Sequence, residues 1–184
     1  MKCAFILFAC TLAGPAAALE NCDEWWFTRN LIFDRAGYCF ASSLGQSIFD
    51  NTGCTPGDPG LDRDTLNIVA GIQALEQQWE CKVDTAGNRL HVPDLPMRLQ
   101  MVDIPVPDEY ESGCMGWRGT PLTLRIARDD GAKITGVIEA GEDIYYGFVG
   151  VEGWSFVLSP GGDADMGWMR NAPFNGESCT NVAG

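Results

Sequence analysis

The amino-acid sequence predicts an α+β protein in which a small, disulfide-tied three-helix unit is followed by a small antiparallel β-barrel. Three observations lead to this prediction. Apolar residues recur with helical spacing in the first half of the chain, they alternate in short runs beyond residue 114, and the cysteines are even in number. A repeat near 3.6 residues is typical of a half-buried helix, whereas a repeat of two is typical of a strand with one buried face.

The first 18 residues have the features of a signal peptide. Lys2 supplies a positive charge, the following stretch is almost wholly apolar, and residues 16–18 are alanines of the size that a signal peptidase requires. We expect cleavage after residue 18. The apolar run is shorter than the roughly 20 residues that span a bilayer. We therefore expect a periplasmic or secreted protein without a transmembrane segment.

Removal of this segment leaves an even number of cysteines, which indicates disulfides in an exported chain. Many pairings are possible, and the spacing alone does not choose among them. Proximity along the chain favours three local pairs: Cys39 with Cys54, Cys22 with Cys81, and Cys114 with Cys179. Zinc is disfavoured because no pair has the C-x-x-C spacing and the single histidine stands beside no cysteine. No metal or cofactor is expected.

The chain is strongly acidic. Its formal net charge is -13, and loss of Lys2 with the signal peptide makes it -14. Such a field repels phosphate backbones and anionic lipid, so nucleic acid is not expected as a partner. The acidity either keeps an exported protein in solution or attracts a basic partner.

Residues 19–84 contain the three predicted helices. The first begins near Asp23, carries large apolar side chains, and ends at Gly37, because glycine readily takes the left-handed conformation that closes a helix. A short second helix is expected from Ser42 or Ser43 to about residue 49. The third and longest runs from the aspartates near residue 62 to about residue 79, since serine and aspartate cap helix N-termini.

An Arg-Asn pair, a following aromatic residue, an Arg-x-Gly-Tyr sequence and a further aromatic residue occur in order across the first helix and its end. The positions are Arg29, Asn30, Ile32, Phe33, Arg35, Gly37, Tyr38 and Phe40. Over about residues 22–81 this pattern resembles the YARHG domain, a small extracellular bacterial module. Ala36 stands where the histidine of that family's name would be. The resemblance implies an extracellular module and brings no established activity.

Residues 85–113 are interrupted by prolines and are predicted to be a connector with one strand-like piece at residues 97–104. Prolines at this density forbid a long helix and stiffen the link between the two halves. Residues 114–184 then show short alternating runs separated by turn residues, which predict a barrel of five or six strands. The runs are residues 115–118, 122–127, 134–139, 144–149, 154–158 and 167–169.

A Leu-Thr-Leu-Arg run at 122–125, a Gly-Trp pair at 153–154 and a closing Gly-Trp pair at 167–168 make residues 114–175 similar to the bacterial Src-homology-3-like domain. Leu124 and Met169 replace the valines that are usual there. A YARHG-like unit joined to such a barrel resembles a family of bacterial secreted proteins. This resemblance implies binding of a peptide, glycan or protein of the cell envelope.

The barrel aromatics are the main candidates for ligand binding, because small barrels bind peptides and glycans through exposed rings beside polar rims. Neighbouring tyrosines in a strand must point to opposite faces, so one can lie in the core while the other faces a groove. Packing of all the rings is the alternative. The candidates are Tyr145, Tyr146, Trp154, Phe156 and Trp168.

Arg29 and Arg35 of the first helix are the other binding candidates. They lie six residues apart and so on different helix faces. In one interpretation at least one of them is partly buried and fixes the fold through bidentate bonds to a carboxylate or to backbone carbonyls. In the other interpretation they form a receptor for an anion or a carboxylate.

No catalytic set is recognisable. His91 has no serine, cysteine or acid at a motif spacing, and acidic pairs such as Asp108 with Glu109, or Glu142 with Asp143, are typical of a solvated surface. Two acidic clusters lack the spacing of a calcium loop; they are Asp58, Asp62 and Asp64, and Asp163 and Asp165. We therefore expect a non-enzymatic binding or accessory protein of the cell envelope. The alternative is an envelope hydrolase, or an inhibitor of one, with carboxylates in a cleft between the two halves.

Overall fold

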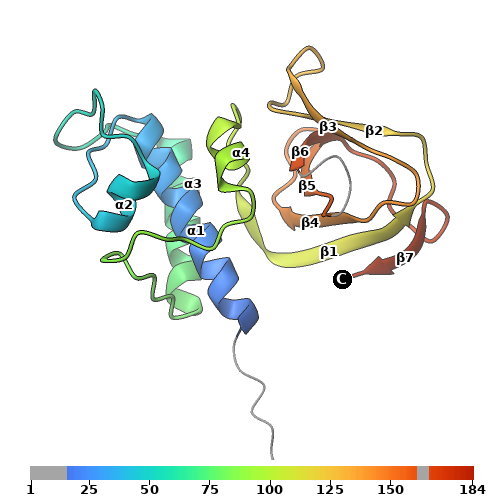
Figure 1. The fold of residues 1–184 in the computed structure, drawn as a ribbon, viewed down its shortest axis with the longest axis horizontal. Helices are drawn as coiled ribbons and strands as arrows, with labels where there is room; N and C mark the ends of the chain where they lie inside the picture. Colours follow the sequence, from blue (N-terminus) through green and yellow to red (C-terminus); the bar gives the residue numbers. More distant parts are fainter. Residues whose placement is uncertain (1–15, 161–165) are drawn as a thin grey trace, which may run out of the picture.

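The computed structural model describes residues 16–160 and 166–184, in which helices and strands occupy opposite sides of the molecule (Figure 1). Residues 1–15 of the predicted signal peptide lie outside the described residues. The first helix begins at Ala16. The α+β class is confirmed, but the described residues form four helices rather than three. The helices are α1 (Ala16–Arg35), α2 (Ser43–Ile48), α3 (Arg63–Gln78) and α4 (Leu95–Gln100).

Helix α1 is the centre of the helical unit. It is buried almost all round because α2 and the chain after it cover one face while α3 covers another. Trp26 and Phe27 pack with Phe49 at the end of α2, whereas Trp25 and Ile32 pack against α3. The helix stops as predicted, with Gly37 at φ +84°. In that conformation a residue with a Cβ is strained, so glycine is required there.

The shorter helices start at the predicted capping residues. The Ser42 hydroxyl accepts the N–H of Gly45 at the start of α2, and the Asp62 carboxylate accepts the N–H of Thr65 at the start of α3. Each bond satisfies a backbone donor that has no partner within the helix. Both helices therefore begin where the sequence favours them.

Three disulfides tie the fold, and they are the three pairs that proximity along the chain favours. Cys22–Cys81 joins α1 to the chain after α3, and Cys39–Cys54 closes a loop around α2. Cys114–Cys179 joins the first and last strands of the sheet. Each bridge therefore constrains only one half of the unfolded chain.

The prediction of a strand-like piece at residues 97–104 is wrong, because Leu95–Gln100 forms helix α4. Pro96 lies in the first turn of this helix, where the missing N–H would have no helical partner and the fixed φ favours a helix. The alternation of apolar and polar residues in this segment is compatible with one and a half helical turns, so it does not identify a strand. The predicted connector, residues 85–113, thus contains α4 and the first part of strand β1.

The second half is one antiparallel sheet in the order β3-β2-β6-β5-β4-β1-β7. It curves strongly but stays open, so the predicted closed barrel is wrong (Figure 1). Among the described residues β3 pairs only with β2, and β7 only with β1. The strands are β1 (Pro107–Trp117), β2 (Leu122–Arg125), β3 (Ile134–Ile138), β4 (Ile144–Phe148), β5 (Trp154–Leu158), β6 (Met166–Arg170) and β7 (Cys179–Ala183).

The barrel prediction failed because alternation identifies strands but does not encode whether the first and last of them pair. Strand β1 is much longer than predicted, and it pairs with β4 on one side and β7 on the other. Strand β7 was not predicted, since Cys179 is its only buried residue and the strand therefore lacks an apolar alternation. It adds an edge to the sheet instead of closing it.

The two halves pack directly against each other. Met101, which follows α4, is fully buried and joins a core cluster with Trp154, Phe156 and Trp168 of the sheet. Helix α4 lies between the helical unit and the sheet (Figure 1). The segment predicted as a connector is therefore part of the hydrophobic interior.

Candidate functional site

A groove of about 560 Å³ lies where the helical unit meets the sheet. Its walls come from α1, from the loop before α4, from the start of β1 and from β4. The residues that line it are Asn21, Glu24, Trp25, Leu90, His91, Val92, Pro93, Pro107, Asp108, Glu111, Tyr145, Tyr146, Gly147, Phe148, Leu158 and Pro160. We define these residues as the interface groove.

The helical wall is held by Glu24 of α1. Its carboxylate accepts two bonds from Nη1 of Arg98, at 2.9 and 2.8 Å, and Arg98 is fully buried. Burial raises the pKa of Glu24 above its usual range, the Arg98 charge opposes this rise, and the acids Asp23 and Glu111 add to it. Burial likewise lowers the pKa of Arg98. The carboxylate that Glu24 contributes to the groove is therefore already paired with Arg98.

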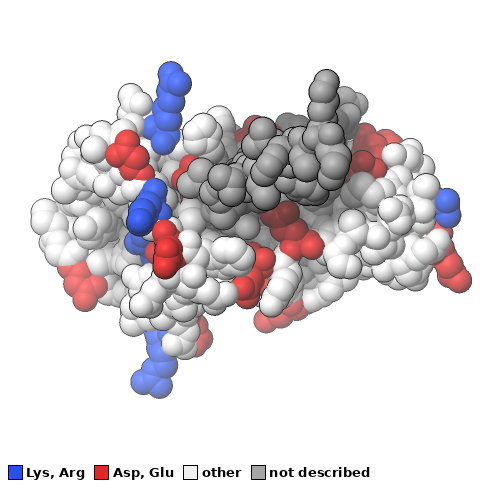
Figure 2. Space-filling model, turned by 90° about the horizontal axis from the view of Figure 1, so that it is seen from below, with Lys and Arg blue, Asp and Glu red and all other residues white. Residues whose placement is uncertain are grey.

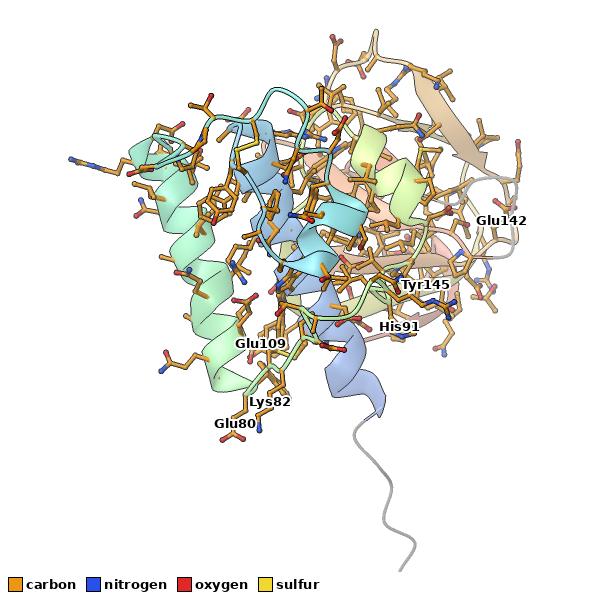
Figure 3. The ribbon with its side chains drawn as sticks, turned by 60° about the vertical axis from the view of Figure 1, so that its left-hand side comes forward. Glu80, Lys82, His91, Glu109, Glu142 and Tyr145 are labelled. Atoms are coloured by element: carbon orange, nitrogen blue, oxygen red, sulfur yellow. A yellow bond between two sulfur atoms is a disulfide. The ribbon has the colours of Figure 1, made fainter. Side chains whose placement is uncertain are left out.

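The loop wall is fixed to the same helix. The backbone N–H of His91 donates to Oδ2 of Asp23 at 2.7 Å, and Val92 is buried in the core beneath α1. The His91 side chain stays exposed and lines the groove. Figure 3 shows His91 and Tyr145 close together at this junction, although they come from the loop and from β4.

The sheet wall comes from β4, where the two neighbouring tyrosines differ as the alternation predicts. Tyr145 is 40% exposed. The ring of Tyr146 packs on Phe174, with centroids 4.6 Å apart, and on the core of the sheet. Burial raises the pKa of the Tyr146 phenol, and its buried hydroxyl has no hydrogen-bond partner. The hydroxyl of Tyr145 donates to Sδ of Met115 at 3.8 Å, and its ring keeps surface that a ligand can contact.

Trp25 forms part of the floor of the groove. Its ring is 1% exposed, and its centroid lies 6.4 Å from that of Trp79. The indole N–H is buried and has no hydrogen-bond partner within the protein. Buried polar groups are normally hydrogen-bonded, so this donor is an exception in the core, and its burial keeps it out of reach of a ligand in the groove.

The rim of the groove is acidic. Asp108 and Glu111 of β1 are exposed and line it together with Glu24. Figure 2 shows acidic atoms spread over one face, with several of them in its middle, while the basic atoms on that face are absent from the middle. No lysine or arginine is among the lining residues. The electrostatic field of the groove therefore favours positive charge.

Three of the five predicted binding aromatics lie in the interior instead. Trp154, Phe156 and Trp168 are buried together, and Phe156 packs edge-on against Trp168 with centroids 5.5 Å apart. The indole N–H of Trp168 donates to the Asp103 carbonyl at 3.0 Å. These rings fill the space between the sheet and α4, so they present no free surface to a ligand.

The predicted binding arginines hold the fold. Arg29 makes a bidentate contact to the carboxylate of Glu76 on α3, with distances of 3.0 to 3.2 Å. Arg35 donates to the backbone carbonyls of Met101 and Val102 after α4, and burial lowers its pKa. Neither arginine lines the interface groove. Both contacts match the structural interpretation of these residues rather than the receptor interpretation.

Each member of the predicted acidic pairs accepts a hydrogen bond within the protein. Asp108 accepts the N–H of Glu109, Glu142 accepts the N–H of Glu139, and Asp143 accepts the N–H of Gly116. Glu109 accepts a bond from the side chain of Gln78. These contacts give the acids roles in turns and strands.

The candidate calcium ligands have similar local roles. Asp58 accepts the N–H of Gly60, and Asp62 caps α3. Asp163 and Asp165 lie outside the described residues. Within residues 16–160 and 166–184, no group of three or more His, Cys, Asp or Glu side chains is arranged to hold a metal ion.

Of the residues that line the groove, the sequence predicted only Tyr145 and Tyr146 as binding residues. Those it missed include Trp25 and the acidic wall formed by Glu24, Asp108 and Glu111. One signal was present. Glu24 stands between buried Cys22 and Trp25 in α1, and a carboxylate on a buried helix face needs a cationic partner. That partner, Arg98, lies in an apolar run 74 residues later, and local spacing does not indicate which acid it meets.

The fold and groove together define a class of protein in which a disulfide-tied helical unit packs on an open antiparallel sheet, with a groove at the junction. The chain belongs to the family of the domain of unknown function DUF4453, whose model matches residues 80–184. The YARHG domain model matches residues 8–77. No curated protein and no solved structure matches the chain.

These matches confirm the YARHG resemblance of the first half and correct the interpretation of the second. The residues that resemble a Src-homology-3-like domain match DUF4453 instead, and their sheet is open. YARHG is an extracellular domain, and three disulfides fit an exported protein. No helix in the described part of the chain has the length and apolar character needed to cross a bilayer.

Proposed function

We propose that this protein is a non-enzymatic binding protein of the cell envelope that holds an extended peptide segment in the interface groove. The observation that carries the proposal is the exposed ring of Tyr145 in a groove built jointly by both halves of the chain. Aromatic rings beside polar rims are frequent anchors for peptides. The YARHG domain has itself been associated with peptide binding, which agrees with this choice of ligand.

The backbone of β1 supports an extended ligand. Strand β1 pairs with β4 at Pro107 and again from Ser112, with an irregular register between them, and with β7 only from Gly113. Residues 108–111 thus have no paired residue in either neighbouring strand, and Asp108 and Glu111 line the groove. Unpaired strand backbone is what an extended peptide uses when it adds to a sheet.

The test is retention on envelope material. Purified protein is incubated with insoluble peptidoglycan and with a panel of immobilised peptides, and the bound fraction is measured. Tyr145→Ala should lower retention about tenfold, because it removes the exposed anchor ring. Ile134→Ala is the control, since Ile134 is another exposed apolar side chain of the same sheet, at 53%, and lies on β3, which contributes no residue to the groove.

Equal loss in Tyr145→Ala and Ile134→Ala, or no loss in either, would contradict binding in the interface groove. Release of soluble fragments from the peptidoglycan pellet would contradict the non-enzymatic assignment and favour the hydrolase instead. The supernatant is therefore analysed in the same experiment.

A further inference from the structure

We propose that the segment held in the interface groove is cationic: a peptide whose lysine or arginine side chain enters the groove and meets the carboxylates of Asp108 and Glu111. This inference rests on the proposed function and adds the chemical class of the ligand. It follows from the charge, the apolar surface and the hydrogen-bonding capacity of the groove.

The charge of the groove is not balanced by the protein. Glu24 is paired with Arg98, but the ion pairs of the described residues include neither Asp108 nor Glu111. Glu111 also raises the pKa of Glu24, so the acids of the groove repel one another. A positive group placed between them relieves this repulsion, whereas an anionic ligand increases it.

The apolar surface beside these acids suits a long side chain with a terminal charge. Trp25, Phe148 and Leu158 line the groove with three prolines. Lysine and arginine bury their methylene stems against apolar surfaces of this kind while the charged end stays near water. A compact cation such as a metal ion gains nothing from that surface.

The backbone beside these acids separates a peptide from a simple amine. Asp108 and Glu111 stand at the two ends of the irregular stretch of β1, residues 108–111, which lies between the residues paired with β4. An extended peptide can add its backbone to such a stretch, whereas a simple amine has no backbone to add. A basic peptide therefore combines the positive charge that the groove favours with main-chain hydrogen bonds to β1.

The test uses three capped pentapeptides that are identical except at the central residue, which is lysine, norleucine or glutamate. Norleucine keeps the aliphatic stem of lysine and removes the charge. Binding to the mature full-length protein is measured by fluorescence anisotropy. The lysine peptide should bind about tenfold more tightly than the norleucine peptide, and the glutamate peptide should bind most weakly. The advantage of lysine should shrink as ionic strength rises.

Variants of the protein that remove one negative charge test whether the preference for the lysine peptide comes from Asp108 and Glu111. Glu111→Gln and Asp108→Asn should each weaken binding of the lysine peptide about three- to tenfold and leave the norleucine peptide unchanged. Glu80→Gln is the matched control and should change neither, because Glu80 is exposed at the end of α3, away from His91 and Tyr145 (Figure 3).

The outcomes distinguish this inference from the proposed function. Binding that depends on Tyr145 but is equal for lysine and norleucine would overturn the cationic ligand and leave peptide binding intact. Binding of a free diamine, 1,5-diaminopentane, as tight as that of the lysine peptide would overturn the peptide requirement. Binding of none of the three peptides would contradict both proposals.

Discussion

Arg98 of α4 donates from Nη1 to both carboxylate oxygens of Glu24 on α1, at 2.9 and 2.8 Å, and so links the connector to the helical unit. The guanidinium carbon lies 5.3 Å from the centroid of Phe27 on α1 and 4.9 Å from that of Phe148 on β4. This buried side chain of α4 therefore contacts both the helical unit and the sheet, and two of its partners, Glu24 and Phe148, line the interface groove.

This pair should matter most when only one member is removed. Arg98→Met or Glu24→Gln alone should lower the free energy of unfolding by about 3 to 5 kcal/mol, because each leaves a buried group without its partner. The double variant Glu24→Gln/Arg98→Met should lie within about 2 kcal/mol of the wild type. Urea unfolding of the four proteins gives the coupling, and additive single effects would contradict it.

Arg29 should act on stability and not on binding. Arg29→Lys keeps the charge but loses the two-point contact with Glu76, so the free energy of unfolding should fall by about 1 to 2 kcal/mol. Arg63→Lys at the exposed start of α3 is the matched control and should have no effect. If Arg29→Lys abolished peptide binding at unchanged stability, the receptor interpretation of this residue would be restored.

The sequence was most informative where structure depends on neighbouring residues. The contacts that cap or end a helix involve residues only a few positions apart. Ser42 and Asp62 cap α2 and α3, and Gly37 ends α1, where the sequence predicts each of these features. The same is true of the opposite orientations of Tyr145 and Tyr146. Local sterics and hydrogen bonding decide these features, so local patterns predict them.

The sequence was least informative where distant segments meet. Three features depend on contacts between segments far apart in the sequence: whether β3 and β7 pair, whether Trp154 faces a groove or a core, and which acid meets Arg98. No periodicity encodes these contacts. The interface groove is built from such contacts, which is why the sequence predicted only its two tyrosines as binding residues.

The buried phenol of Tyr146 should make the protein sensitive to alkali. Its pKa is raised in the folded state, so above about pH 10 the folded protein holds a proton that the unfolded chain has released. Stability therefore falls as pH rises through that region. Tyr146→Phe removes the ionisable group and should flatten this decline, with little change or a gain of up to about 1 kcal/mol at pH 7.

Exposed Tyr110 supplies the control for that experiment, because Tyr110→Phe removes a phenol that is not buried. The free energy of unfolding is measured in urea at several pH values from 7 to about 11. A decline of equal steepness in wild type and Tyr146→Phe would contradict a role for the buried phenol.

Cleavage between the halves tests both the disulfides and the interface. Lys82 and Arg89 are exposed in the loop after α3, so limited trypsin should cut there. None of the three disulfides in the described part of the chain crosses this loop. Non-reducing denaturing mass analysis should therefore give two separate fragments, and a single linked mass would refute the pairing.

The cut protein should nevertheless stay together under native conditions. The fragment that begins after Arg89 carries α4, whose Arg98 and following residue Met101 are buried against α1 and the sheet. Size-exclusion chromatography should show one species of the uncut mass, because contacts of this kind persist without a covalent link. Elution of the two fragments as independent species would show that the interface is weak. The same cut in Arg98→Met should release the fragments, since the remaining partner, Glu24, is then a buried carboxylate without a cation.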